Sequence, residues 1–383
     1  MRLAIFYYNF GPHHLARLSA SVALGKKRGV TVFGVETVKN YDAYPWIIEA
    51  GVLRDYIYTL QPSLTQKNRH NGSIISQMWL ALNRLCPDAL AICGYDRWEM
   101  VTAAAWAKRR ERITVFMSDS KADDLPRNFL KETMKSCLIK SFDAALVAGT
   151  LHKDYAISLG IPPQRVFTGY DVVDNDYYAQ GAATASARAA SLRSQLGLSR
   201  PFFLNVSRFI DKKNLLRLVE AYRIYRQDTS GVPWDLILCG SGPIENILRA
   251  ATADLPGVHF PGFKQEDELT DYYGLASVFI IPSSHFEQWG LVVNEAMASG
   301  LPVLVSKACG CAPDLVQEGV NGFTFNPYDT KGLARRMVKM SSGEADLKAM
   351  GQASQRIIAD WTPEVFAQNL FKAMDVCLAK RGA

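Results

Sequence analysis

Short apolar runs alternate with stretches of helical periodicity along most of this chain. The apolar runs predict β-strands at residues 2–8, 30–35, 88–93, 113–117, 144–147, 202–206, 235–239, 278–281 and 302–305. Strands that alternate with helices are typical of parallel sheets covered by helices. The pattern therefore predicts an α/β protein.

A chain of 383 residues is too long for one hydrophobic core and suits two domains. An Ala-rich stretch at 181–190 separates the two groups of predicted strands. We therefore expect an N-terminal domain over 1–170, a linker over 171–200 and a C-terminal domain over 201–361. A Thr-Pro pair then opens a final segment, 362–383, whose apolar residues recur at helical spacing.

The composition is that of an ordinary soluble globular protein, with 48% hydrophobic and 21% charged residues. No apolar run approaches the ~18 residues of a membrane span, and the apolar start at 2–8 is too short for a signal peptide. The seven cysteines are odd in number and contain no C-x-x-C pair, which favours reduced thiols. We therefore expect a cytoplasmic protein.

Residues 286–300 are the most informative part of the sequence. They place two carboxylates, Glu287 and Glu295, around Gly290, where an apolar helix-forming run begins between the last two predicted strands. Both acids therefore fall at the mouth of a βαβ crossover, where open α/β sheets bind ligands and a helix N-terminus suits a phosphate. Because bare acids repel phosphate, the carboxylates make sense as ligands of sugar hydroxyls on the same molecule.

This segment resembles the E-x7-E signature of the family 4 glycosyltransferases, which are retaining enzymes with the GT-B fold. Four further motifs of that family have counterparts here, in the family's order and within residues 202–326. They are Arg208 with Lys213 after a strand, the glycine turn Gly240-Ser241-Gly242, the nucleotide-side loop 258–263 and the closing loop 319–323. The first half of the chain matches the family only loosely.

The resemblance implies two Rossmann-like domains that face each other across a cleft, with the final helix crossing back to the N-terminal domain. It also implies transfer of a sugar from a nucleotide-sugar, held by the C-terminal domain, to a hydroxyl of a glycan or lipid-linked acceptor. Configuration would be retained, and catalysis would rest on positioning and charge stabilisation without a cofactor. Synthesis of cell-surface polysaccharide or glycoconjugate is the expected setting.

The resemblance also assigns parts of the donor to individual residues. Arg208 and Lys213 hold the diphosphate and stabilise it as it leaves, Glu295 accepts hydrogen bonds from the ribose, and Glu287 faces the transferred sugar. The catalytic residues implied are therefore Arg208, Lys213 and Glu287. The other donor-binding residues implied are Gly11, Gly240, Gly242, Phe263 and, through their backbone N–H groups, Gly290, Leu291 and Val292.

The N-terminal half departs from the family in two places. Members usually carry a glycine pair after the first strand, where this chain offers only Gly11. Many also carry a His after a later strand, where Asp119 stands here. We take His14 and Asp119 as candidates for contact with the sugar or the acceptor, although a His near a helix start is more often a capping or packing residue.

Two short patterns suggest metal binding but are weak. Asp174-Asn175-Asp176 is the D-x-D signature of the other large glycosyltransferase fold, and Cys309-Gly310-Cys311 pairs two thiols. D-x-D often arises by chance, and no second Cys or His pair lies near the thiols in sequence. We expect no metal, because Arg208, Lys213 and a helix N-terminus supply the positive charge.

Positive charge is concentrated in the first half of the chain. Residues 1–170 contain 22 Lys and Arg against 14 Asp and Glu, whereas the whole chain has 43 against 37. Two interpretations stay open: solubilising charge on solvated helix faces, or docking on the inner face of an anionic membrane near a lipid-linked acceptor. We expect no nucleic acid as a partner, since no binding motif accompanies the charge.

Two functions other than transfer also stay open. A nucleotide-sugar epimerase can use the same pair of Rossmann-like domains, and an inactive GT-B scaffold can bind a nucleotide-sugar without turnover. The combination of Arg208, Lys213, Glu287 and Glu295 fits a transferase better than either of them.

Overall fold

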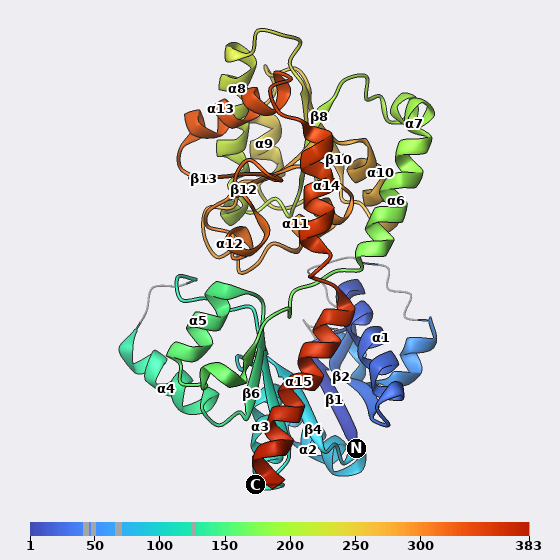
Figure 1. The fold of residues 1–383 in the computed structure, drawn as a ribbon, viewed down its shortest axis with the longest axis vertical. Coiled ribbons are helices and arrows are strands. Elements are labelled where there is room, and N and C mark those ends of the chain that lie inside the picture. Colours follow the sequence, from blue (N-terminus) through green and yellow to red (C-terminus); the bar gives the residue numbers. More distant parts are fainter. Residues whose placement is uncertain (41–45, 47–50, 66–70, 125–127, 383) are drawn as a thin grey trace. The chain divides into compact units, whose positions relative to one another are not determined.

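The chain folds into two compact units, each built around one parallel sheet (Figure 1). The computed structural model describes residues 1–40, 46, 51–65, 71–124 and 128–382. The described residues of the first unit lie within 1–122, 128–173 and the segment from Trp361 onward, and those of the second unit comprise Asp174–Asp360 with Asp123 and Asp124. The α/β prediction is therefore confirmed.

The first unit has a sheet whose described strands follow the order β3-β2-β1-β4-β5-β6-β7, all parallel. The strands are β1 Arg2–Tyr7, β2 Thr31–Asn40, β3 Ile57–Thr65, β4 Ala89–Cys93, β5 Ile113–Ser118, β6 Ala144–Val147 and β7 Val166–Phe167. The covering helices are α1 Pro12–Lys27, α2 Asn71–Leu85, α3 Trp98–Arg109, α4 Phe129–Ile139, α5 Thr150–Ser158 and α15 Pro363–Gly382. Successive strand residues enter two apolar cores, one on each face of the sheet.

The final helix, α15, packs into the first unit, as predicted. Phe366, Leu370 and Met374 of this helix are fully buried in the core that α1 also covers. Arg28, just after α1, forms an ion pair with Asp375 at 2.9 Å. Figure 1 shows red α15 beside blue α1, so the first unit is built from two segments far apart in sequence.

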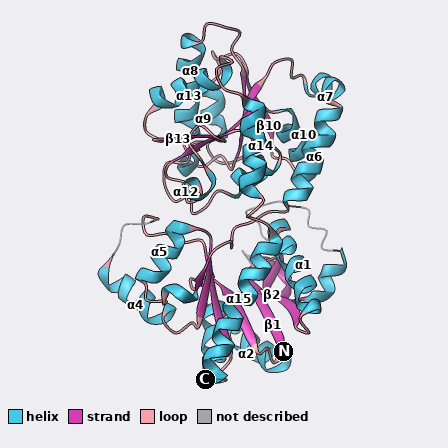
Figure 2. Ribbon diagram, in the orientation of Figure 1, coloured by secondary structure: helices cyan, strands magenta, loops and turns pink. Residues whose placement is uncertain are grey.

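The second unit has a sheet with the order β10-β9-β8-β11-β12-β13 among its described strands, again all parallel (Figure 2). The strands are β8 Phe202–Val206, β9 Asp235–Cys239, β10 Val258–Gly262, β11 Val278–Ile281, β12 Val303–Ser306 and β13 Gly322–Phe325. The helices are α6 Asn175–Ala187, α7 Ala189–Leu196, α8 Leu215–Asp228, α9 Glu245–Ala251, α10 Glu266–Leu275, α11 Leu291–Ala298, α12 Ala312–Leu315, α13 Thr330–Ser341 and α14 Leu347–Ile358. Within the described ranges, no helix combines the length and apolarity that crossing a bilayer requires.

The segment 171–200 does not form the linker that we predicted. Most of it folds as α6 and α7, which belong to the second unit. Its small residues serve close packing: a side chain at Gly181 would overlap Thr270 of α10, and one at Gly274 would overlap the backbone of Ala182. Gly181, Ala182 and Ala185 therefore form a tight contact between α6 and α10, whereas Ala183, Ala187 and Ala190 are exposed.

Four observed strands were absent from our prediction, namely β3, β7, β10 and β13. We predict loops at 258–263 and 319–323, whereas Val258–Gly262 and Gly322–Phe325 are strands that pair with β9 and β12 at the two edges of the second sheet. The residues of β10 are only half-buried, and the apolar residues of β13 are interrupted by Gly322 and Thr324. They therefore lack the continuous apolar run by which we recognised the central strands.

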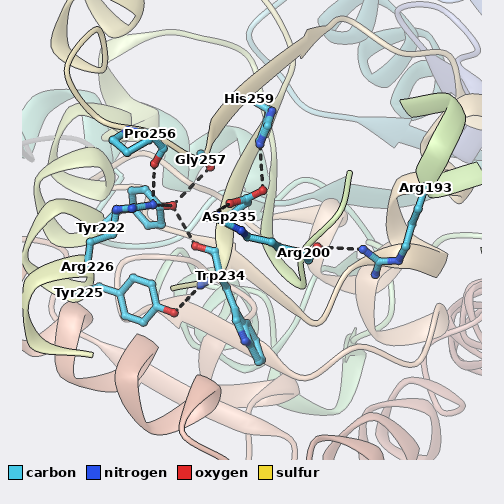
Figure 3. Close-up of polar contacts among 10 residues, drawn as sticks. All are labelled: Arg193, Arg200, Tyr222, Tyr225, Arg226, Trp234, Asp235, Pro256, Gly257 and His259. Carbon is cyan, nitrogen blue, oxygen red and sulfur yellow. Dashed lines mark hydrogen bonds and ion pairs between the residues drawn. The ribbon is translucent and has the colours of Figure 1, made fainter. Parts of the chain in front are cut away.

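Polar contacts join the amino ends of β9 and β10 to α8 (Figure 3). Asp235, the first residue of β9, lies 3.1 Å from Nε2 of His259 in β10. Tyr222 of α8 donates to the carbonyl of Trp234, and the N–H of Trp234 donates to the Tyr225 hydroxyl, both at 2.9 Å. These contacts hold α8 against the amino edge of the sheet. They do not involve the loops at the opposite, carboxyl edge.

Candidate functional site

The candidate site lies at the carboxyl edge of the second sheet. The predicted residues follow the strands as expected: Arg208 and Lys213 after β8, Gly240 and Gly242 after β9, Phe263 after β10, Glu287 and Gly290 after β11, and Leu291, Val292 and Glu295 on α11. Backbone bonds tie the first loops together, since Phe209 donates to Ser241 at 2.8 Å and Gly240 donates to Gly262 at 2.9 Å. The structure thus gathers the residues predicted for the second unit at one edge.

Lys213 and Glu287 form a buried ion pair between two of these loops. Nζ of Lys213 lies 2.5 Å from Oε2 of Glu287, although the residues are 74 positions apart. Their side chains are only 13% and 10% exposed. The Ser283 hydroxyl donates to the same carboxylate oxygen at 2.8 Å. A buried ion pair needs such additional hydrogen bonds to offset its desolvation.

The residues on either side of Lys213 hold the same loops together. Nζ of Lys212 donates to the carbonyl of Phe286 at 2.8 Å. Asn214 adopts a left-handed conformation, with φ of 58°, and its amide donates to the carbonyls of Pro282 at 3.0 Å and Pro327 at 2.8 Å. The backbone around Lys213 is therefore fixed from both sides.

The ion pair decides the charge of Glu287. Burial raises the pKa of the Glu287 carboxyl, but Lys213, Lys212 and the Ser283 hydroxyl outweigh burial and bring the pKa below its ordinary value. The carboxylate is therefore ionised at neutral pH and remains the counter-ion of Lys213.

The N-terminus of α11 lies beside this ion pair. Gly290 precedes the helix with φ of 107° and, as a glycine, supplies no side-chain cap. A Cβ added at Gly290 would lie 3.8 Å from Cγ of Glu287. The first N–H groups of a helix, here including those of Leu291 and Val292, have no acceptor within the helix. Their positive dipole end therefore lies next to Lys213 and Glu287, where it suits an anion.

The backbone of Cys309-Gly310-Cys311 holds the loop that carries Glu287. The N–H of Gly310 donates to the carbonyl of Glu287 at 3.1 Å, and the N–H of Cys311 donates to the carbonyl of Trp289 at 3.2 Å. Both cysteines are fully buried, and burial raises the pKa of Cys311 well above its usual range. These thiols are therefore packing residues.

Glu295 is oriented by a tyrosine from another helix. Its side chain is buried, and Oε2 accepts a hydrogen bond from the Tyr273 hydroxyl of α10 at 2.7 Å. Burial, and then the charge of Glu295, raises the pKa of Tyr273 well above its ordinary value. Tyr273 therefore stays protonated and keeps donating to the carboxylate.

The glycine turn after β9 has a clear packing role. Gly240 has φ of 144° and Gly242 has φ of 157°, and a Cβ at either would overlap a backbone carbonyl, of Ser207 or Phe209 respectively. The β9 loop therefore lies directly against the β8 loop on both sides of Arg208. Arg208 itself is half-buried, and its carbonyl accepts the Ile210 N–H at 3.0 Å.

The predicted residues of the N-terminal half lie in the first unit. Gly11 is the N-cap of α1, and its N–H donates to Nδ1 of His14 at 3.2 Å. The His14 ring also stacks on Tyr7, with centroids 4.1 Å apart. Burial, and then the charge of Arg17, lowers the pKa of His14 well below its ordinary value. His14 is thus a neutral capping and packing residue, while Asp119 follows β5 at the carboxyl edge of the first sheet.

The D-x-D pattern has a structural explanation. Asp174 is the N-cap of α6, and its carboxylate accepts the N–H of Tyr177 at 3.0 Å. In the part of the chain that the structure describes, no three His, Cys, Asp or Glu side chains group around a possible metal position.

Sequence reasoning missed several residues that shape this site. Ser283 was detectable, because it follows β11 just as Arg208 follows β8. Tyr273 gave no signal, since it lies within a helix whose contact with α11 arises only in three dimensions. The same holds for Asn214, whose amide joins residues 68 and 113 positions away.

Residues 190–357 match the family described as Glycosyl transferases group 1. The amylovoran biosynthesis glycosyltransferase AmsK of Erwinia amylovora is 28% identical over 248 residues, which cover 62% of this chain and 56% of that protein. A GDP-mannose-dependent alpha-(1-6)-phosphatidylinositol monomannoside mannosyltransferase of Mycobacterium tuberculosis is 29% identical over 195 residues, covering 48% and 50% respectively. The chain thus spans about half the length of these two curated relatives.

Solved structures share the fold over nearly the whole chain. A glycosyltransferase from Rickettsia africae has a TM-score of 0.73 at 14% identity and covers 98% of both chains. Anabaena Alr3699/HepE in complex with UDP and glucose has a TM-score of 0.73 at 16% identity, covering 98% of this chain and 99% of that one. The fold is therefore that of the GT-B glycosyltransferases, and the similarity to the glycosyl transferases group 1 is confined to residues 190–357.

Proposed function

We propose that this protein is a retaining glycosyltransferase that moves a sugar from a nucleotide-sugar to a hydroxyl of a glycan or lipid-linked acceptor. The observation that carries the proposal is the buried Lys213–Glu287 pair beside the N-terminus of α11. This pair lies within the segment that matches the group 1 family. Polysaccharide or glycoconjugate synthesis is the proposed setting, in line with the name of the relative AmsK, an amylovoran biosynthesis glycosyltransferase.

The donor's diphosphate is proposed to bind Arg208, Lys213 and the first N–H groups of α11. The planar fork of Arg suits phosphate oxygens, and the three donors of Lys let it bind Glu287 and a phosphate together. When the bond from sugar to phosphate breaks, negative charge builds on the leaving diphosphate. Groups that already hold positive charge at that point lower the barrier.

The rest of the donor is proposed to lie against the two acids and Phe263. Glu295 binds the ribose diol, since a carboxylate accepts several hydrogen bonds and Tyr273 supplies only one of them. Glu287 orients Lys213 and faces the transferred sugar. The Anabaena protein of similar fold has been solved with UDP and with UDP-glucose, which supports a nucleotide-sugar as the ligand class. No metal is part of the proposal.

The acceptor is proposed to be lipid-linked, at the inner face of an anionic membrane. On α4 of the first unit, Leu130 and Met134 lie one turn apart and are 72% and 73% exposed. Lys131 and Lys140 are exposed on or next to the same helix. Apolar side chains among basic ones are typical of a helix that lies on a membrane surface. The mycobacterial relative is named for a phosphatidylinositol glycolipid, which supports this class of acceptor.

Incubation with a panel of UDP-, GDP- and ADP-sugars tests the proposed reaction. A transferase is expected to release free sugar slowly without an acceptor, an epimerase to produce an isomeric nucleotide-sugar, and an inactive scaffold to produce neither. A true donor at ~100 times its dissociation constant should add about 2.7 kcal/mol to the free energy of unfolding. Arg208→Ala should abolish most of the sugar release and most of the gain in unfolding free energy. The anomeric proton signal of the product reports whether the configuration is retained or inverted.

A further inference from the structure

The second unit contains a pocket that shares no lining residue with the candidate site. It encloses about 460 Å³, a volume typical of sites for small molecules. Its walls come from the carboxyl ends of β12 and β13 and from one side of α13, from its first turn to its last. The lining residues are Lys307, Thr324, Phe325, Asn326, Asp329, Gly332, Arg335, Arg336 and Lys339.

The lining is strongly basic. Four cationic side chains face a single carboxylate, that of Asp329, and only Arg335 approaches it, at 3.7 Å. Among the residues that the structure describes, Lys307, Arg336 and Lys339 form no ion pair with a carboxylate. The pocket therefore carries a surplus of positive charge that its own walls do not neutralise.

Two of these cations are held in place by an aromatic ring. The guanidinium of Arg336 lies 4.5 Å and Nζ of Lys339 lies 5.0 Å from the centroid of Phe323. Phe323 belongs to β13 and is only 6% exposed, so it is a rigid support. Crowding two like charges onto one ring is unfavourable unless an anion compensates them, because like charges at short range repel.

We propose that this pocket binds a small phosphorylated molecule of about the size of a sugar phosphate. Arg and Lys side chains on α13, together with Lys307 after β12, surround the phosphate. The pocket is larger than one phosphate group requires, and the side-chain amide of Asn326 is suited to hydroxyl groups, whereas the Thr324 hydroxyl already donates to Glu318.

The wall of the pocket also touches the candidate site. Residues 326–329 form the loop between β13 and α13. In this loop, the Pro327 carbonyl accepts from Asn214 at 2.8 Å, and the Tyr328 hydroxyl donates to Ser284 at 3.1 Å. Asn214 follows Lys213, and Ser284 follows Ser283, so the loop contacts both segments that hold the ion pair.

Calorimetric titration of the full chain with glucose 6-phosphate tests the proposal, with glucose and inorganic phosphate as comparison ligands. Wild-type protein should bind glucose 6-phosphate saturably, more tightly than inorganic phosphate, with no detectable binding of glucose. Arg336→Gln with Lys339→Gln should weaken binding at least tenfold. Binding should also weaken as salt increases, because the contacts are ionic.

Two further variants locate the binding. Lys331→Gln with Lys348→Gln removes the same charge from exposed positions outside the pocket and should leave affinity unchanged. Lys213→Ala should also retain binding, which separates this pocket from the candidate donor site. The proposal is overturned if glucose 6-phosphate does not bind saturably, or if inorganic phosphate binds equally tightly. It is also overturned if the Arg336/Lys339 variant binds glucose 6-phosphate as tightly as wild type, or if Lys213→Ala no longer binds it.

Discussion

Tyr273 donates a hydrogen bond of 2.7 Å to Glu295, so the carboxylate proposed to bind ribose is oriented by a helix outside the donor motifs. Tyr273→Phe should therefore weaken binding of UDP or GDP by about tenfold and cost about 1.5 kcal/mol of unfolding free energy, the usual contribution of a hydrogen bond to a charged group. Calorimetry and urea denaturation measure the two effects. Tyr272→Phe is the matched control, since the neighbouring Tyr272 is also buried and, among the described residues, its hydroxyl makes no hydrogen bond. Equal effects of both substitutions would contradict the orienting role.

The two acids should differ in what they bind. Glu295→Ala should weaken binding of the bare nucleoside diphosphate, whereas Glu287→Ala should mainly lower turnover, because Glu287 is proposed to act on Lys213 and the sugar. Titration of both variants with UDP and GDP, next to turnover with the complete donor, separates the roles. Equal losses of nucleotide affinity in the two variants would contradict the separate roles proposed for Glu295 and Glu287.

Lys213 and Glu287 should prove strongly coupled in stability. Each single change, Lys213→Met or Glu287→Gln, disrupts a buried pair and should cost about 3 kcal/mol of unfolding free energy. The double variant should lose at least ~1 kcal/mol less than the sum of the single losses. Denaturation of all four proteins gives this coupling. Additivity within about 0.5 kcal/mol would mean that the pair does not form in solution.

The lowered pKa of Glu287 predicts a contribution to stability that depends on pH. A carboxyl whose pKa is lower in the folded state stabilises the fold above its unfolded pKa of about 4.3, and this contribution disappears as the pH falls through the folded pKa. The advantage of wild type over Glu287→Gln should therefore be complete near neutral pH and shrink below about pH 4.3. Glu220→Gln, an exposed change on α8, serves as control and should parallel wild type throughout.

Membrane docking through α4 predicts a specific loss in vesicle sedimentation. Leu130→Ser with Met134→Ser should reduce binding to vesicles containing anionic lipid, and high salt should reduce binding of the wild type. Leu216→Ser with Ile247→Ser removes two exposed apolar side chains from the second unit and should have no effect. If wild-type protein ignores anionic vesicles at low salt, a soluble acceptor becomes the better interpretation.

The central strands of both sheets could be predicted because their continuous apolar runs are buried on both faces. In the second unit, the predicted strands also located Arg208 and Glu287, because residues that directly follow parallel strands lie at one edge of the sheet. The ion pair between Lys213 and Glu287 was not predicted, because sequence spacing does not tell which loops touch across 74 residues.

Other features depended on packing that leaves little trace in sequence. The Ala-rich stretch looked like a linker because small residues suit both flexible segments and close helix contacts, and only the position of Thr270 opposite Gly181 distinguishes them. His14 was ambiguous for a similar reason: its cap on Gly11 and its stacking on Tyr7 require knowing where the first strand ends.

The placement of α15 has a consequence for synthesis of the protein. Phe366, Leu370 and Met374 fill the core of the first unit, yet the ribosome makes them after the entire second unit. During translation the second unit can therefore complete its core first, although domains usually fold in order from the N-terminus. The nascent first unit must wait with apolar surface uncovered, which makes it the natural client of chaperones until residues 361–382 emerge.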